Sequence, residues 1–127
     1  MPDVDTFRFG GIRLATGPQL HYAEHGLSGG EPVLFLHGWP DSWVSFSRVV
    51  TLLPTDVRAL IPDQRGFGDS DRPERGYAIE DLAEDAVEFL DGLSIDRASI
   101  VGHSFGSFVA RRLALSHPER VDRMVLI

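Results

Sequence analysis

The segment Gly102-His103-Ser104-Phe105-Gly106 carries the clearest chemical signal in the sequence. It lies between a short apolar run, residues 98–101, and a helical pattern that starts at Phe105, which predicts a serine on a sharp turn from a strand into a helix. Such a turn strains the backbone at the serine and requires small residues two positions to either side. The helix N-terminus favours a developing oxyanion beside the hydroxyl. Ser104 is therefore the candidate nucleophile; the alternative is a Gly/Ser-rich turn without activity.

The turn His37-Gly38-Trp39-Pro40 follows a second apolar run, residues 33–36. A turn at a strand end can direct a backbone N–H group across the sheet toward Ser104. We expect the N–H groups of Trp39 and Phe105 to form an oxyanion hole, in which each donor contributes about 3–4 kcal/mol to transition-state stabilisation. Pro40 has no N–H and cannot be the donor. The alternative is a plain turn in which Trp39 packs into the core.

A glycine-rich loop, Asp63-Gln64-Arg65-Gly66-Phe67-Gly68-Asp69-Ser70, follows a third strand pattern. We expect Asp63 and Arg65 to pair and to brace this loop beside the site. The alternative is that Arg65 binds an acidic substrate.

The elements that must position these residues alternate along the chain. Apolar runs predict strands over residues 7–14, 20–25, 33–36, 57–61, 98–101 and 124–127. Helical spacing predicts helices from residue 41 or 42 to 53, over 79–93 and over 105–116. Strands that alternate with helices imply right-handed crossovers. We therefore expect an α/β fold with three layers, in which helices flank a mainly parallel sheet.

The other histidines are weaker candidates. His21 and His25 match the inverted zinc-protease pattern H-x-x-E-H, but on a strand they lie about 13 Å apart, too far for one metal ion. We expect no metal site. His103 is expected to be packed and hydrogen-bonded rather than to act as the general base. His117 is expected to complement the helix dipole on the surface.

Composition removes several classes of chemistry. The chain has 127 residues, 12 basic against 19 acidic residues, a net charge of −7, and neither Lys nor Cys. A Schiff base, a thiolate nucleophile and a zinc–thiolate site are excluded. A negative chain without a basic stripe is a poor nucleic-acid binder. No apolar run reaches the length of a membrane span, and residues 1–5 do not resemble a secretory signal, so we expect a cytoplasmic protein without a membrane partner. Its expected partner is a small-molecule substrate.

The order of the motifs HGWP, DQRGFGDS and GHSFG resembles the α/β-hydrolase fold superfamily, from about Phe7 to Ile127. Their forms are similar to the branch that holds epoxide hydrolases, haloalkane dehalogenases, haloperoxidase-like esterases and carbon–carbon bond hydrolases. The resemblance implies that Ser104 is the nucleophile and that the Trp39-Pro40 peptide bond is cis. Epoxide hydrolases and dehalogenases carry Asp at this position, so Ser104 implies an ester or related acyl or C–C bond as substrate. Ser107 stands where many members have glycine, which implies slightly looser packing.

In this family the catalytic acid and histidine follow the serine, whereas here only residues 105–127 follow Ser104. We therefore expect one domain, residues 1–127 with its motifs in 31–127, that is incomplete at its C-terminus and forms the N-terminal part of a longer hydrolase. Alone it is expected to be inactive and to self-associate through the open edge of its last strand. We expect no cofactor, since both G-x-G-x-x-G and the P-loop are absent. The alternative function is a non-catalytic small-molecule binding protein on the same fold.

Overall fold

The computed structural model describes residues 6–127; the acidic residues 1–5, for which we predicted no signal function, lie outside this range. Six strands form one sheet in the order β1-β2-β4-β3-β5-β6. Strand β2 runs antiparallel to both of its neighbours, and the ladders from β4 through β3 and β5 to β6 are parallel. This confirms the mainly parallel sheet. The strands are β1 (Arg8–Arg13), β2 (Gln19–His25), β3 (Glu31–Leu36), β4 (Val57–Pro62), β5 (Ala98–Gly102) and β6 (Val121–Leu126).

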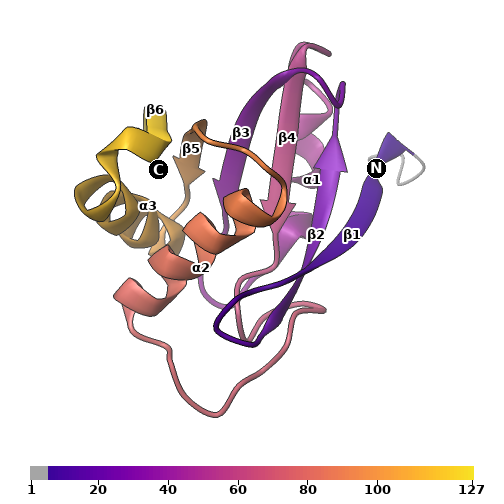
Figure 1. The fold of residues 1–127 in the computed structure, drawn as a ribbon. Coiled ribbons are helices and arrows are strands. Elements are labelled where there is room, and N and C mark those ends of the chain that lie inside the picture. Colours follow the sequence, from indigo (N-terminus) through magenta and orange to yellow (C-terminus); the bar gives the residue numbers. More distant parts are fainter. Residues whose placement is uncertain (1–5) are drawn as a thin grey trace.

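Helices cover both faces of the sheet, as the three-layer prediction requires. Figure 1 shows α2 (Ile79–Gly92) and α3 (Phe105–Ser116) on one face and the short α1 (Ser47–Val50) on the other. Each face has its own buried cluster. The cluster under α2 and α3 contains Phe89, Leu90, Ile100 and Leu113, and the cluster under α1 contains Phe35, Phe46 and Val50. Both clusters fix the strands whose ends carry the candidate site.

The helix expected up to residue 53 is shorter and tighter than predicted. A 3-10 turn, η2 (Trp43–Phe46), precedes the single α-helical turn α1. Hydroxyl groups compete for the backbone here, because Ser45 and Ser47 both donate to carbonyl groups three residues earlier. The sequence showed the apolar spacing but not this competition.

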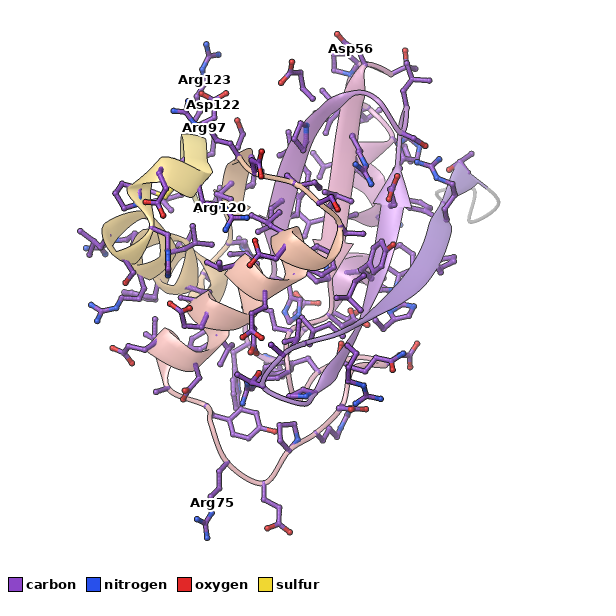
Figure 2. The ribbon with its side chains drawn as sticks, viewed as in Figure 1. Asp56, Arg75, Arg97, Arg120, Asp122 and Arg123 are labelled. Atoms are coloured by element: carbon purple, nitrogen blue, oxygen red, sulfur yellow. The ribbon has the colours of Figure 1, made fainter. Side chains whose placement is uncertain are left out.

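Strand β6 begins at Val121, three residues earlier than the apolar run that predicted it. Asp122 and Arg123 interrupt the hydrophobic pattern, yet Val121 pairs with Ala98 of β5 after the short 3-10 helix η3 (Pro118–Arg120). Figure 2 shows these charged side chains gathered at the end of the sheet that lies opposite the candidate site.

The outer edge of β6 has no partner strand among the described residues. Val125 is 53% exposed and Ile127 is 66% exposed. Self-association through this edge stays a prediction. Within residues 6–127 no helix is both long and apolar enough to cross a membrane.

Candidate functional site

Ser104 lies on a strained turn between β5 and α3, as the sequence predicts. Its φ of 54° and ψ of −118° place a residue with a side chain in a region that ordinarily requires glycine. The amide of His103 donates to the Leu36 carbonyl (3.0 Å), and the amide of Ser104 donates to the Ile127 carbonyl (2.8 Å). The turn is therefore held between the ends of β3 and β6, with the Ser104 side chain exposed.

Both flanking glycines are required by close backbone contacts. A Cβ at Gly102 would lie 2.6 Å from the Gly106 carbonyl oxygen. A Cβ at Gly106 would overlap the Leu36 carbonyl of β3. The Ser107 hydroxyl donates a hydrogen bond to the Ser104 carbonyl (2.6 Å), so this polar side chain is satisfied within the turn. The looser packing expected at Ser107 stays a prediction. The geometry at Ser104 thus depends on small residues that allow α3 to pack directly against β5 and β3.

The predicted oxyanion turn is anchored by a buried histidine. The Nε2 of His37 accepts the Gln64 amide (3.0 Å), so its Nδ1 carries the proton and donates to the Gly38 carbonyl (2.8 Å). The Gln64 side chain donates in return to the His37 carbonyl (2.8 Å). Burial lowers the pKa of His37 and keeps the ring neutral. His37 therefore acts as a fixed structural group rather than as a base.

Gly38 brings this turn against Ser104. A Cβ on Gly38 would lie 3.1 Å from the Ser104 Cβ, so the two backbones approach closely. The Trp39-Pro40 peptide bond is cis, as predicted. The Trp39 side chain is 65% exposed, which excludes the alternative that it packs into the core. Phe105 is the first residue of α3, where a backbone N–H has no acceptor within the helix. The oxyanion role of Trp39 and Phe105 stays a prediction.

The expected pair between Asp63 and Arg65 is wrong. The chain turns at Arg65, which sends its guanidinium to α2, where it forms two hydrogen bonds with Asp85 (2.6 and 2.7 Å). Asp63 instead accepts from the Trp43 amide (2.8 Å), the Asp69 amide (3.0 Å) and His21 Nδ1 (2.9 Å). Both residues still brace the loop: Asp63 through backbone amides and His21, and Arg65 through Asp85. The pKa of Asp85 is raised by burial, although Arg65 opposes this shift.

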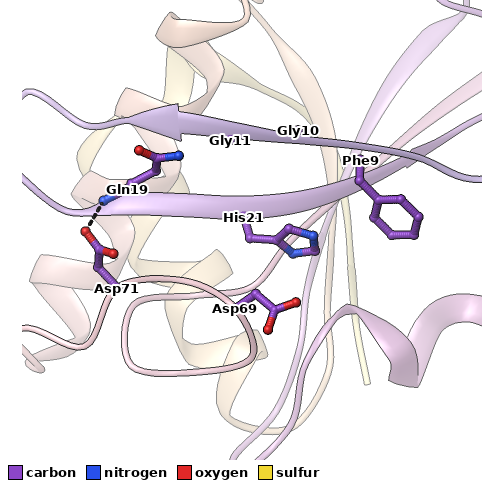
Figure 3. A pocket seen from close by; sticks show the side chains of 7 residues that line it. All are labelled: Phe9, Gly10, Gly11, Gln19, His21, Asp69 and Asp71. Carbon is purple, nitrogen blue, oxygen red and sulfur yellow. Dashed lines mark hydrogen bonds between the residues drawn. The ribbon is translucent and has the colours of Figure 1, made fainter.

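His21 and His25 lie on β2, which confirms the strand prediction against the metal-binding helix. His21 contributes instead to a hollow shown in Figure 3, together with Phe9, whose ring stacks on it at 5.7 Å. The ligand-type atoms of His21, Asp63 and Asp69 lie within 4.8 Å of one another. N–H groups already occupy the Asp63 carboxylate, so this is a hydrogen-bonded cluster that fixes the loop.

The expectation that His103 is packed and hydrogen-bonded is wrong, whereas the expectation that it is not the general base stays a prediction. Its side chain is exposed rather than packed, and its ring makes no hydrogen bond within residues 6–127. In the same range the Ser104 hydroxyl has no histidine partner. The described residues therefore provide a candidate nucleophile and two candidate oxyanion donors, and they place no base beside them.

His117 is the C-cap residue of α3, as its predicted place near the helix end requires, but it is half-buried rather than on the surface. Its role in complementing the helix dipole stays a prediction. Its ring contacts Glu84 of α2 (2.7 Å) and Glu119 (3.6 Å), and these carboxylates raise its pKa above the ordinary value of 6.5. A raised folded-state pKa stabilises the fold fully below about pH 6.5, and the effect disappears as the pH rises through the folded-state pKa.

Substituting His117→Gln should therefore lower the Tm at pH 6, by a few degrees in order of magnitude, and change it less at pH 8. Thermal unfolding followed by circular dichroism at both pH values measures this difference. The matched control is His103→Gln, because His103 is exposed and lacks a hydrogen-bonding partner in the described chain. Equal pH dependence for both variants would contradict a stabilising role of the His117 ion pairs.

Comparison with known proteins agrees with the geometry. Residues 31–127 match the family model described as the alpha/beta hydrolase fold. The chain is 32% identical over 114 residues to a soluble epoxide hydrolase of a Corynebacterium species, covering 90% of this chain and 39% of that protein. It is 39% identical over 112 residues to epoxide hydrolase 2 of Siraitia grosvenorii, covering 86% of this chain and 35% of that protein.

Solved structures show the same relationship. Cfl2 from Burkholderia cenocepacia has a TM-score of 0.91 and 36% identity, covering 96% of this chain and 41% of its own. A putative acyltransferase from Salmonella enterica has a TM-score of 0.92 and 34% identity, covering all of this chain and 43% of its own. The chain thus spans less than half the length of each of these relatives. With the strand–serine–helix turn, the sheet order and the family match in agreement, the chain belongs to the α/β-hydrolase fold family.

Proposed function

We propose that the complete protein is a serine hydrolase that cleaves an ester or a related acyl or C–C bond. The observation that carries this proposal is Ser104, exposed on a strained turn at the N-terminus of α3. The Ser104 oxygen attacks the substrate carbonyl carbon and passes its proton to a base. The N–H groups of Trp39 and Phe105 bind the resulting oxyanion. The leaving group departs with a proton, and water then releases the acyl group from the serine.

The base and its orienting carboxylate are the two components of this mechanism that have no candidate at the site among residues 6–127. A serine hydroxyl is a weak nucleophile without a base, and the base itself needs an orienting carboxylate. His37 is neutral and fully engaged, and His103 lacks a carboxylate partner. We therefore assign the base and its acid to other residues of the complete protein.

Epoxide hydrolysis is the second candidate, because several relatives carry that name. The chemistry of Ser104 favours the acyl reaction. A serine that opened an epoxide would form an ether, which has no carbonyl for water to attack, so the enzyme would stay blocked. A serine acylated by an ester forms a new ester, which water can cleave.

A fluorophosphonate probe and two substrates test the proposal. We expect the probe to modify Ser104, as seen by peptide mass spectrometry, and the protein to hydrolyse a p-nitrophenyl ester but to release no diol from styrene oxide. Diol release that depends on Ser104 would favour the epoxide reaction. A folded protein that binds small esters but neither reacts with the probe nor turns them over would be a binding protein on this fold.

A further inference from the structure

A hollow of about 360 Å³ lies beside the predicted oxyanion turn. Its lining residues come from three segments: Trp39 from the turn, Gly66 and Phe67 from the loop after β4, and Arg72, Pro73 and Tyr77 from the stretch that leads into α2. The indole of Trp39 forms one wall, while the backbone N–H of the same residue is the predicted oxyanion donor. The hollow therefore adjoins the residue whose N–H group is the predicted oxyanion donor.

The walls of the hollow are aromatic. The Trp39 ring lies 5.0 Å from the Phe67 ring and 6.1 Å from the Phe105 ring, measured between centroids and edge-on in both cases. The hydroxyl of Tyr77 donates to the Pro73 carbonyl, which fixes its ring across the hollow. Gly66, with a φ of +85°, leaves room for that ring, because a Cβ there would lie 2.7 Å from it. These walls suit an apolar or aromatic portion of a ligand.

Arg72 is the only charged residue that lines the hollow. Its guanidinium donates one hydrogen bond, to the Gly68 carbonyl (3.1 Å), and forms no ion pair with any described residue. Asp41 and Asp71 border neighbouring hollows that Arg72 also lines, yet neither pairs with it. Most other arginines of the chain are paired with carboxylates, namely Arg8, Arg13, Arg58, Arg65, Arg97, Arg112 and Arg120. A guanidinium has five N–H donors, so Arg72 keeps four for a ligand.

We propose that this hollow is the acyl subsite of the hydrolase and that Arg72 binds a carboxylate at the far end of the acyl group. The substrate class is thus the half-ester of a dicarboxylic acid, whose apolar chain lies between Trp39, Phe67 and Tyr77. A planar guanidinium matches a carboxylate with two parallel hydrogen bonds. This inference rests on the proposed function.

Two p-nitrophenyl esters of equal chain length test the subsite: the hemiglutarate, which carries a carboxylate, and the neutral valerate. We expect the complete protein to prefer the hemiglutarate. Arg72→Gln should raise the KM for the hemiglutarate about 10-fold, with kcat and the valerate kinetics nearly unchanged. The matched control is Arg75→Gln, since Arg75 projects away from the fold at the tip of the same loop (Figure 2). Equal kinetics for the two arginine variants would overturn the subsite while leaving the hydrolase proposal intact.

A binding measurement keeps the two proposals apart. The fluorescence of Trp39 is obtained as the difference between the spectra of the complete protein and of its Trp39→Phe variant, and this difference reports on the hollow. Phenylacetate should quench this fluorescence more strongly than benzyl alcohol, and Arg72→Gln should abolish the difference. This result together with no turnover of either ester would support the anion subsite and contradict the hydrolase. Equal quenching by the acid and the alcohol would contradict the subsite whatever the activity.

Discussion

Replacing Ser104 by alanine in the complete protein should lower kcat for ester hydrolysis by about 10⁶-fold, the loss measured when a triad serine is removed. The predicted oxyanion donors and the proposed acyl subsite remain in this variant, so a residual acceleration of about 10³–10⁴ over water should persist. The hydroxyl is exposed and has no histidine partner among the described residues, so the fold should not depend on it. Steady-state kinetics on a p-nitrophenyl ester, with Tm measured in parallel, give both quantities.

Ser116→Ala is the matched control for this loss. Ser116 is an exposed serine on the same helix, at the end remote from the turn. It should leave kcat unchanged. If Ser104→Ala kept the wild-type rate, another residue would have to be the nucleophile.

Replacing Asp85 by alanine should lower the free energy of unfolding by about 3–5 kcal/mol. The carboxylate makes two short hydrogen bonds to Arg65, and the side chains are only 4% and 8% exposed. Its removal leaves a buried guanidinium without a hydrogen-bonded carboxylate. Because a domain of this size has about 5–15 kcal/mol of stability in total, a large part of it would be lost. Urea denaturation followed by circular dichroism measures the change.

The control for this prediction is Asp91→Ala, on the same helix. Asp91 also contacts an arginine closely, with 2.7 Å to Arg120, but its side chain is 59% exposed. Solvent screening limits such a pair to about 1 kcal/mol or less. Equal losses for the two variants would show that burial does not set the strength of the Arg65–Asp85 pair. The double variant Arg65→Met/Asp85→Leu should regain part of the stability.

The sequence predicted the elements that have strong periodic signals. The spacing of Ile79, Leu82 and Phe89 identified α2 within one residue of its observed end, and the glycines around Ser104 identified the turn. The segment from Trp43 to Val50 was less predictable, because apolar spacing cannot tell a 3-10 turn from an α-helix. Local patterns therefore located the elements better than they described their ends.

Pairings between distant residues were the part of the site that the sequence could not supply. Asp63 and Arg65 are neighbours in one motif, which suggested a pair, yet the turn at Arg65 separates their side chains. One usable signal was missed. Asp85 lies next to Ala86 at the border of the apolar face of α2, and a buried acid there predicts a cationic partner from another segment. The exposure of the His103 side chain could not be predicted either, because it depends on the three-dimensional path of the turn and not on a local sequence pattern.

The hydrogen bonds from the turn to Leu36 and Ile127 have a consequence for the order of folding. One of them closes a long loop back to β3, and the other joins the turn to a strand that is synthesised after it. Such non-local contacts form late, because the entropy of loop closure is lost before the contacts compensate for it. Ser104 should therefore acquire its strained conformation only when β3, β5 and β6 have assembled. Labelling of Ser104 by the serine probe would then follow the last step of folding rather than the formation of α3.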